Sequence, residues 1–354
     1  MNRDFWKGKR VFLTGHTGFK GGWLALWLTD MGADVHALAL KAPTNPDFSS
    51  VCGLHRHLAA DVTADICDGA TLRDAMRKAR PDVVFHLAAQ SLVRYSYAEP
   101  VETYAVNVMG TVNVLDAIRH TPTVKAAVMV TTDKCYENRE WVWPYRENEA
   151  MGGHDPYSSS KGCAELVTAA YRRSFLDGAG IQIASARAGN VIGGGDWAAD
   201  RLIPDFLRAI DAGQTLKIRS PNATRPWQHV LEPLNGYLTL AESLYTRGKP
   251  MAEAWNFGPD ESDARPVQWI VKHLCALVPG AKWQCDYAQH PHEANFLKLD
   301  SSKAKRELGW FPHWDLKAAL RNTVDWHQSW RRGEDMRLVS LEQIRAYEAS
   351  PRRQ

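Results

Sequence analysis

Residues 14–21 decide the fold and read Thr14-Gly15-His16-Thr17-Gly18-Phe19-Lys20-Gly21. They follow the apolar run Val11-Phe12-Leu13 and precede a helical pattern that starts near Trp23. A strand, a tight glycine turn and a helix start together indicate a unit that binds a dinucleotide. A purely structural turn is the alternative, but the position directly after the first predicted strand favours the binding unit.

Each glycine of this turn has its own expected role, although the spacing is G-x-x-G-x-x-G rather than the usual G-x-G-x-x-G. Gly15 permits the turn, Gly18 lets the backbone approach a pyrophosphate, and Gly21 lets the helix pack close to the strand. The helix N-terminus then presents unpaired N–H groups to the phosphate. The predicted cofactor contacts of this turn are Gly15, His16, Thr17, Gly18, Phe19 and Lys20.

The composition is that of an ordinary soluble globular protein, with 354 residues of which 45% are hydrophobic and 23% charged. The formal net charge of +3 argues against nucleic-acid binding. No apolar run approaches the roughly 18 residues of a membrane span, and residues 1–10 contain no signal-peptide core. The six cysteines lack a C-x-x-C pairing, so we expect reduced cytoplasmic thiols and no metal site.

Apolar and amphipathic runs alternate through the first half of the chain. The apolar runs predict buried parallel strands at 10–14, 34–40, 57–62, 82–87, 126–131 and 181–187. The amphipathic runs predict helices at 21–31, 69–79, 99–119 and 157–175. This alternation predicts an α/β fold with a doubly wound parallel (Rossmann) sheet, in which ligands bind beyond the carboxyl ends of the strands.

The sequence changes character after residue 188, where glycines cluster and prolines separate shorter elements. We predict a dinucleotide-binding domain at 1–188, to which a segment near 230–244 returns. A smaller α/β substrate lobe is expected at 189–330. Residues 331–354 form a tail with a further helical run at 337–348, which we expect to be a solvated surface helix rather than a binding arm.

The stretch Tyr157-Ser158-Ser159-Ser160-Lys161 places a tyrosine and a lysine on one face of a predicted helix. A free tyrosine has a pKa near 10, so a role as base at pH 7 needs about 4 kcal/mol of differential stabilisation. We expect the Lys161 ammonium and a cationic nicotinamide ring to supply it. A surface pair that arises by chance is the alternative.

Thr132, Asp133 and Lys134 follow the predicted fifth strand directly. Thr132 is suited to hydrogen-bond a substrate hydroxyl that Tyr157 deprotonates. Asp133 and Lys134 add an acid and a potential base in the same mouth of the sheet. A polar turn without a chemical role is the alternative for this tripeptide.

The glycine loop, Thr132 and the Tyr157/Lys161 pair, in this order, resemble the extended short-chain dehydrogenase/reductase family. The resemblance covers about residues 8–325 and implies an NAD-dependent epimerase or dehydratase that acts on a nucleotide-sugar. It implies an adenine contact at Asp65 and Ile66, with Asp61-Val62 as a second choice. The further cofactor contacts that it implies are Leu87, Ala88, Ala89, Asn107, Tyr157 and Lys161.

Two features depart from the family pattern. NAD binders usually carry an acid near the end of the second strand, but this end reads Leu38-Ala39-Leu40-Lys41. Lys41 would even suit a 2′-phosphate, so NADP stays an alternative to the NAD that the resemblance implies. Lys20 is also unusual in the glycine loop, where it would pair with a phosphate or hinder the seating of the cofactor.

Longer strings at 133–136, 138–141, 193–197, 225–230 and 290–294 narrow the resemblance to the CDP-glucose 4,6-dehydratase family. It implies that Asn190, Arg201 and Arg225 bind the diphosphate region of the substrate. Arg219 and Glu293 are weaker candidates, for which surface ion pairs are the alternative. Glu293 or a nearby backbone group is also a candidate to distinguish cytosine from uracil.

The resemblance implies a lyase of deoxysugar biosynthesis, as in lipopolysaccharide assembly. Tyr157 would take the proton of the glucose C4 hydroxyl, with Thr132 orienting it. Asp133 would protonate the leaving C6 hydroxyl, and Lys134 would remove the C5 hydrogen where most relatives have a glutamate. We expect burial and the neighbouring cations to lower the pKa of Lys134 for this role.

Other classes remain open from the sequence alone. A UDP-N-acetylhexosamine 4,6-dehydratase that inverts C5 would use a similar Asp-Lys pair. A non-catalytic nucleotide sensor would require a damaged triad, whereas Thr132, Tyr157 and Lys161 are all present. The resemblance also implies a homodimer through the helices predicted at 99–119 and 157–175, with a homotetramer as the further possibility.

Overall fold

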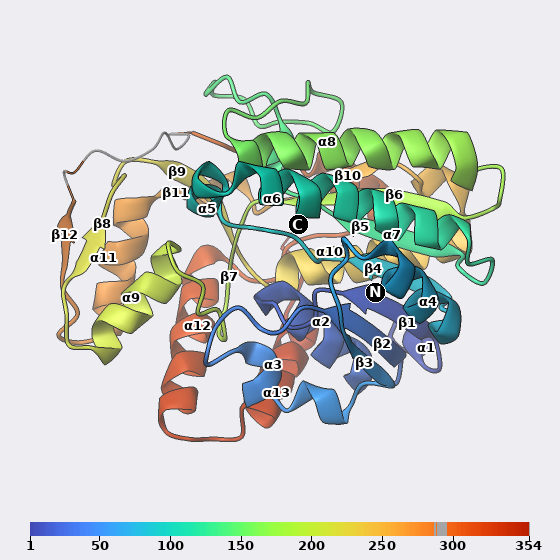
Figure 1. Ribbon diagram of the computed structural model, residues 1–354. Coiled ribbons are helices and arrows are strands. Elements are labelled where there is room, and N and C mark those ends of the chain that lie inside the picture. Colours follow the sequence, from blue (N-terminus) through green and yellow to red (C-terminus); the bar gives the residue numbers. More distant parts are fainter. Residues whose placement is uncertain (287, 289–295, 354) are drawn as a thin grey trace.

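The computed structural model describes residues 1–286, 288 and 296–353 (Figure 1). A seven-stranded parallel sheet with the order β10-β6-β5-β4-β1-β2-β3 forms its centre. Its strands are β1 (Arg10–Thr14), β2 (Asp34–Ala39), β3 (Ala60–Thr63), β4 (Val83–His86), β5 (Ala126–Val130), β6 (Gln182–Ala188) and β10 (Ala254–Phe257). The doubly wound parallel sheet expected from the alternating pattern is confirmed.

Successive residues of the central strands face opposite sides of the sheet. In β1, Val11 and Leu13 pack into one hydrophobic core and Phe12 packs into another. The helices α4 (Gly69–Ala79), α7 (Gly110–Arg119) and α8 (Pro156–Tyr171) cover the side of Phe12, whereas α2 (Phe19–Asp30) and α10 (Leu231–Arg247) cover the other (Figure 1). Both faces are therefore buried, as parallel sheets require.

The helix predicted at 99–119 is built from three pieces. It consists of α6 (Pro100–Tyr104), a π-helical turn η2 (Ala105–Met109) and α7. In the same way, α8 continues into a second π-helical turn, η4 (Arg172–Leu176). This part of the chain also contains the short α-helices α1 (Arg3–Trp6), α3 (Phe48–Val51) and α5 (Val93–Ala98).

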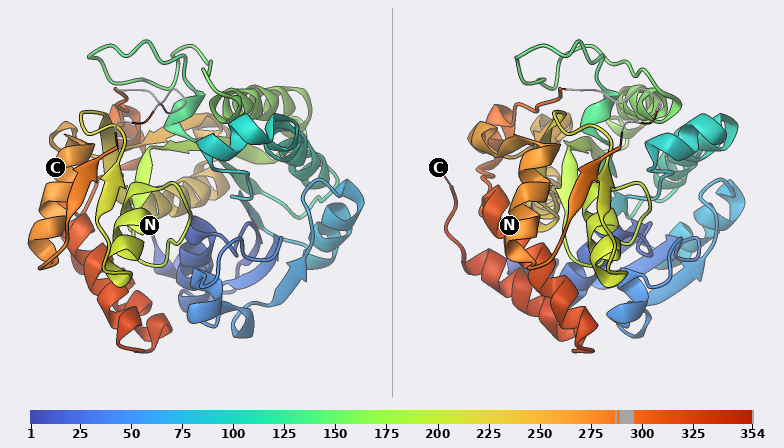
Figure 2. Two further views of the ribbon diagram at one scale, coloured as in Figure 1. Left: turned by 60° about the vertical axis from the view of Figure 1, so that its left-hand side comes forward. Right: turned by 90° about the vertical axis from the view of Figure 1, so that its left-hand side faces the viewer.

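A second, smaller group of elements lies beside the main sheet (Figure 2). It contains the three-stranded sheet β11-β9-β7 and the two-stranded sheet β12-β8. Its elements are β7 (Asn190–Ile192), β8 (Leu216–Ile218), β9 (Thr224–His229), β11 (Ala264–Pro266), β12 (Trp283–Cys285), α9 (Leu202–Asp211), α11 (Val267–Leu277) and α12 (Leu316–Arg331). They share a separate core that includes Phe206, Trp227 and Leu320.

No single boundary in the sequence separates the two groups, because two elements after residue 188 return to the main sheet. The segment near 230–244 forms most of α10, which packs against β5 and β6. The strand β10 then pairs with β6 at the edge of the main sheet, in the stretch that the sequence assigned to the substrate lobe. None of the helices in the described part of the chain has the length and apolar character that a membrane crossing needs.

The tail helix α13 (Met336–Ala349) is not a solvated surface helix, so this expectation is wrong. Tyr347 is 1% exposed and lies edge-on to Trp27 of α2. The Tyr347 hydroxyl donates a hydrogen bond of 2.7 Å to Glu232 Oε2 of α10. Glu348 accepts hydrogen bonds from Arg3 Nη1 at 2.8 Å and Trp27 Nε1 at 2.9 Å. The scattered arginines of the tail obscured this buried face in the sequence pattern.

Glu232 makes this docking sensitive to pH. The carboxylate also accepts the backbone N–H groups of His313 and Trp314, at 3.0 and 2.7 Å. Burial nevertheless dominates and raises the pKa of Glu232 from 4.5 to about 7. A raised pKa means that the folded state favours the protonated form. Protonated Glu232 therefore contributes its full stabilisation to the folded state below pH 4.5, and this contribution is lost as the pH rises through about 7.

We predict that Glu232→Gln removes this pH dependence, because the amide does not ionise. The wild-type protein should lose on the order of 3 kcal/mol relative to the variant as the pH rises from 4.5 to 7. Thermal unfolding measured at several pH values checks this, with Glu242→Gln on the same helix as the matched control. Parallel curves of melting temperature against pH for wild type and Glu232→Gln would contradict it.

Candidate functional site

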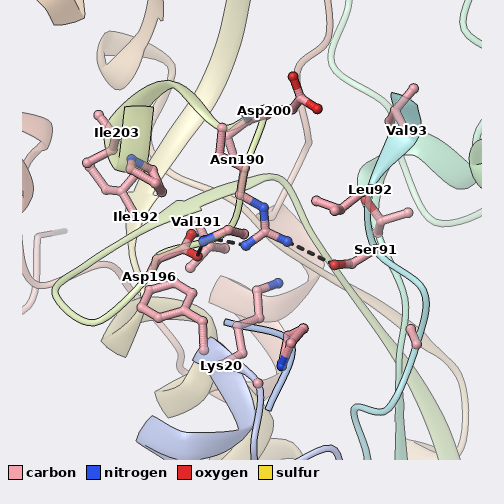
Figure 3. Close-up of a pocket in the computed structure, with 18 of the residues that line it drawn as sticks. Lys20, Ser91, Leu92, Val93, Asn190, Val191, Ile192, Asp196, Asp200 and Ile203 are labelled. Carbon is pink, nitrogen blue, oxygen red and sulfur yellow. Dashed lines mark hydrogen bonds and ion pairs between the residues drawn. The ribbon is translucent and has the colours of Figure 1, made fainter. Parts of the chain in front are cut away.

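A cavity of about 710 Å³ opens beyond the carboxyl ends of the main strands, between the sheet and the second group of elements. Its walls come from the glycine loop, from the segments that follow β2, β3, β4, β5 and β6, and from α8, α9 and β8. Figure 3 shows part of these walls, with Lys20 on one side and Asn190, Asp196 and Asp200 on another. The position agrees with the rule that ligands of parallel sheets bind beyond the strand ends.

The glycine loop has the shape of a cradle for a ligand. Gly15 has a φ of +83°, and an added Cβ would lie 2.6 Å from Ala88 N. A Cβ on Gly21 would lie 2.1 Å from the carbonyl oxygen of Gly15, so the helix start and the turn are in direct contact. A Cβ on Gly18 would meet only the Gly15 oxygen, at 3.4 Å, and Gly18 lines the cavity. The three glycines therefore have the different surroundings that their expected roles require.

Two predicted cofactor contacts lie behind the cavity walls instead of in them. His16 is 1% exposed, and its Nε2 lies 3.0 Å from Asp61 Oδ1. The side chain of Asn107 exchanges hydrogen bonds of 2.9 Å with the backbone of Gln90 and donates another of 2.9 Å to Ser160 Oγ. Both side chains therefore support a wall of the cavity from behind. The sequence did not reveal this, because sequence position alone does not tell which way a side chain turns.

The other predicted cofactor contacts are brought together along one side. Asp65 and Ile66 line the cavity together with Leu87, Ala88 and Ala89, whereas the second choice, Asp61-Val62, does not. The end of β2 contributes Ala39, Leu40 and Lys41. Asp47 also lines this side and was missed by the sequence reasoning, but its carboxylate caps α3 through Ser50 N at 2.9 Å and Ser50 Oγ at 2.6 Å.

Lys20 points its ammonium group into the cavity (Figure 3). Burial and, after it, the positive charge of Arg201 lower the pKa of Lys20 to about 8. The Arg201 guanidinium is held by Asp196 Oδ2 at 3.0 Å and by Ser91 Oγ at 2.9 Å. The glycine loop and the second group of elements therefore place two cations side by side, which suits a ligand with more than one phosphate.

Tyr157 and Lys161 occupy the first turns of α8. Asp155 caps this helix by accepting Ser158 N at 2.9 Å, and Pro156 fits its first turn. Burial raises the pKa of Tyr157 to about 12 and lowers that of Lys161 to about 8. Burial therefore favours the neutral phenol, and the hydrogen bond with Thr132 is the largest influence that lowers the pKa of Tyr157.

The Thr132-Asp133-Lys134 tripeptide forms the start of a 3₁₀ turn, η3 (Asp133–Cys135), directly after β5. Thr132 Oγ1 donates a hydrogen bond of 2.9 Å to Asp133 Oδ1. Asp133 is 1% exposed, and its Oδ2 has no hydrogen-bond partner among the described residues. Burial raises the pKa of Asp133 against the lowering effect of the neighbouring Lys134. Lys134 is half-buried and lines the same cavity.

The predicted substrate contacts also converge, with one exception. Asn190, Arg201, Arg219 and Arg225 all line the cavity, whereas Glu293 lies outside the described residues. Arg219 Nη1 lies 3.2 Å from Asp200 Oδ1, and the same oxygen lies 2.8 Å from Arg94 Nη1 of α5. The sequence reasoning missed the carboxylates Asp196 and Asp200, although each lies a few residues before Arg201 in the chain.

Comparison with known proteins agrees with this geometry. The family model described as GDP-mannose 4,6 dehydratase matches residues 12–323. A curated CDP-glucose 4,6-dehydratase of Salmonella typhimurium is 54% identical over 353 residues, which cover 98% of each chain. The chain belongs to the nucleotide-sugar 4,6-dehydratase family. A second member, a dTDP-glucose 4,6-dehydratase of Streptomyces griseus, is 31% identical and covers 90% of this chain and 95% of its own.

Solved structures share the fold of this dehydratase family member. The epimerase Mth375 of Methanothermobacter thermautotrophicus superposes with a TM-score of 0.79 at 24% identity, covering 93% of this chain and 95% of its own. A dTDP-glucose 4,6-dehydratase of Bacillus anthracis in complex with NAD superposes with a TM-score of 0.75 at 21% identity, covering 92% and 99%. The architecture is therefore common to epimerases and dehydratases, and the side chains in the cavity must distinguish the two reactions.

We predict that two glycine variants of this dehydratase separate folding from ligand approach. Gly21→Ala forces a backbone clash and should lower stability by about 1–3 kcal/mol. Gly18→Ala meets an ordinary contact, so stability should change by about 1 kcal/mol or less. Its methyl group would stand in the cavity and weaken dinucleotide binding about tenfold or more. Thermal unfolding and a titration of the tryptophan fluorescence with NAD measure both effects, and equal losses of stability would contradict the assignment.

Proposed function

We propose that the protein converts CDP-glucose into CDP-4-keto-6-deoxyglucose and water. The observation that carries this proposal is the meeting of two pairs in one cavity, Tyr157 with Lys161 and Asp133 with Lys134. The first pair suits oxidation of a hydroxyl group, and the second suits elimination of water. A 4-epimerase needs only the first pair. The 54% identical relative, named a CDP-glucose 4,6-dehydratase, supports the choice of nucleotide.

NAD fits the glycine cradle, and we propose it as the cofactor. Gly15, Thr17, Gly18, Phe19 and Lys20 would hold its phosphates, and Asp65 and Ile66 would contact its adenine. Bound NAD would supply hydride transfer, from C4 of the sugar in the oxidation and back to C6 at the end. The absence of a carboxylate from Leu38-Ala39-Leu40-Lys41 at the end of β2 favours weak retention, so added NAD should raise the activity of the isolated protein. His16 and Asn107 would support the cofactor site from behind.

The protein's own groups carry the proton transfers. Tyr157 takes the proton of the C4 hydroxyl, and Thr132 orients that hydroxyl by a hydrogen bond. Burial opposes the tyrosinate, so Lys161 and the positive charge of the bound cofactor together must stabilise it. The resulting ketone makes the C5 hydrogen acidic, which prepares the elimination.

Asp133 and Lys134 have different roles in the elimination. Asp133 has a raised pKa because it is buried, so it is suited to protonate the leaving C6 hydroxyl. Lys134 removes the C5 hydrogen as a base. The separation of acid and base by environment is the same device that pairs of carboxylates use in other enzymes.

The substrate diphosphate would contact the cations of the second group of elements. Arg201, Arg219 and Arg225 line that side of the cavity, together with Asn190. In this structure Asp196 Oδ2 lies 3.0 Å from Arg201 Nη1, and Asp200 Oδ1 lies 3.2 Å from Arg219 Nη1. Substrate phosphates would therefore compete with these carboxylates. We also propose that Glu293, which lies outside the described residues, distinguishes cytosine from uracil.

We further propose that the protein acts in the cytoplasm, in deoxysugar biosynthesis, as a homodimer. Apolar side chains on α6, η2 and α8 are exposed, among them Val101 at 82%, Met109 at 53% and Leu166 at 61%. Figure 1 shows α6 and α8 on the same side of the molecule, and η2 packs against both. An apolar patch of this kind suits an isologous contact with a second copy, which would form a four-helix bundle.

We expect Val101→Asp combined with Leu166→Asp to produce a monomer, because the charges would be buried at the interface. Sedimentation velocity of wild type and variant measures the change, and Val142→Asp, at an exposed apolar residue outside these helices, is the control. A wild-type monomer would contradict the proposal, and a wild-type tetramer that the variant reduces to dimers would show a second interface.

Turnover of CDP-glucose should proceed without net formation of NADH, because the hydride returns to the sugar within each cycle. The alkaline absorbance of the 4-keto product and the absorbance of NADH at 340 nm are to be followed together. UDP-, GDP- and dTDP-sugars serve as comparison substrates. NADH that accumulates in proportion to product would indicate a simple dehydrogenase instead.

Lys134→Met should stop the elimination while C4 oxidation remains possible, whereas Tyr157→Phe should block the first hydride transfer. Loss of a positioned base typically lowers the rate 10²–10⁴-fold, or roughly 3–5 kcal/mol of barrier. Exchange of the C5 hydrogen with solvent deuterium, together with transient NADH, separates the two variants. If Lys134→Met exchanged this hydrogen at the wild-type rate, Asp133 or a bound water would be the base.

A further inference from the structure

A buried ion pair lies directly behind the two catalytic pairs. Glu165 of α8 and Arg187 of β6 are each 4% exposed at their side chains. Arg187 Nη2 donates to Glu165 Oε2 at 2.8 Å, and Arg187 Nε donates to Glu165 Oε1 at 2.9 Å. Ser185 Oγ adds a further hydrogen bond of 2.6 Å to Glu165 Oε2. This bidentate pair is not required by the reaction steps described above.

The pair tethers both ends of the loop that carries the acid and the base. At the start of the loop, Thr131 Oγ1 donates a hydrogen bond to Glu165 Oε1. At its end, Arg187 Nη1 donates to the Tyr136 hydroxyl at 2.7 Å. Tyr136 in turn donates to Asn256 Oδ1 of β10 at 2.7 Å. Residues 132–135, which include Asp133 and Lys134, therefore lie between two anchors on one ion pair.

The same carboxylate acts on the oxidation pair. Tyr157, Lys161 and Glu165 follow one another at intervals of four residues along α8, so they share a face of the helix. Glu165 raises the pKa of Lys161 against the effect of burial. Three other ionisable groups act on Lys161 or feel its charge, namely Cys135 of η3, His86 of β4 and Lys20 of α2. Among these groups, Glu165 has the strongest effect in favour of the ammonium form.

We propose that Glu165 and Arg187 are positioning residues that couple oxidation to elimination, by fixing the 132–135 loop at both ends and keeping Lys161 charged beside Tyr157. The inference rests on the proposed 4,6-dehydratase function. Elimination must follow oxidation at adjacent carbon atoms of one sugar, so the two pairs need a fixed relative geometry. A misplacement of about 1 Å can lower a rate about 100-fold, which makes a shared anchor valuable.

Stability by itself does not explain the pair. Replacing a buried ion pair with apolar residues is often neutral or stabilising, because both ions lose their hydration. Here the carboxylate accepts hydrogen bonds from two side chains besides Arg187, namely Thr131 and Ser185. Arg172 and Cys135 are the further ionisable groups that feel its charge. A fully connected network of this kind specifies one geometry of the loop.

The test compares four single variants in the full-length protein with NAD and CDP-glucose. Glu165→Gln should lower kcat on the order of 100-fold with little change in KM. It should also move the alkaline limb of the pH profile to lower pH by about one unit, because Lys161 loses its favourable partner. Thr131→Val and Tyr136→Phe each remove one loop anchor. They should lower C5 hydrogen exchange relative to transient NADH, without moving that limb.

Ser185→Ala is the matched control, because it removes a hydrogen bond of the same carboxylate without touching either loop anchor. Its kcat and pH profile should stay near wild type. If Glu165→Gln does not fold, the two anchor variants decide the question. An unmoved alkaline limb in a folded Glu165→Gln, or anchor variants that behave like Ser185→Ala, would overturn the inference. A wild-type enzyme that does not turn over CDP-glucose would instead overturn the proposed function.

Discussion

Removal of water from the mouth of the sheet is the constraint on which this site depends. Parallel strands end together at one edge, and the second group of elements covers that edge, so the ionisable groups there lose hydration. Burial accordingly raises the pKa of Asp133 and Tyr157 and lowers that of Lys20 and Lys161. Burial moves each of these groups toward its neutral form, so neighbouring charges must favour the charged form wherever the reaction needs it.

The same constraint explains why charges behind the cavity are paired. A buried charge without a partner is unfavourable by several kcal/mol, so Glu165 and Arg187 satisfy each other and their neighbours. At the mouth, Asp196 and Asp200 lie at the arginines that we propose for the diphosphate. The side chains of the interior pair are each 4% exposed, whereas those of Arg201 and Asp200 are 33% and 39% exposed, so phosphate would reach the arginines at the mouth. A rigid centre and an exchangeable entrance thus follow from different degrees of burial.

Much of the fold could be predicted because it depends on local patterns. The alternation of apolar and amphipathic runs indicated β1 to β6 and the longer helices between them, with boundaries that differ by a few residues, but not the short helices α3 and α5. The missed features depend on partners distant in sequence. The strand β10 is only four residues long and is defined by its pairing with β6. The tail helix was expected to be solvated, yet Tyr347 and Glu232 join it to the core across 115 residues.

The sequence by itself determined the parallel sheet, the glycine turn and most of the residues that meet in the cavity, because motifs at strand ends lie at one edge of such a sheet. The tertiary structure decided which motif residues face the ligand side: His16 and Asn107 turn into the walls instead. It also decided the ionisation of the site, since a pKa depends on hydration and on charges from other segments. Tyr157 is an example. Its spacing from Lys161 led us to expect a lowered pKa, whereas its burial in the folded protein raises the pKa.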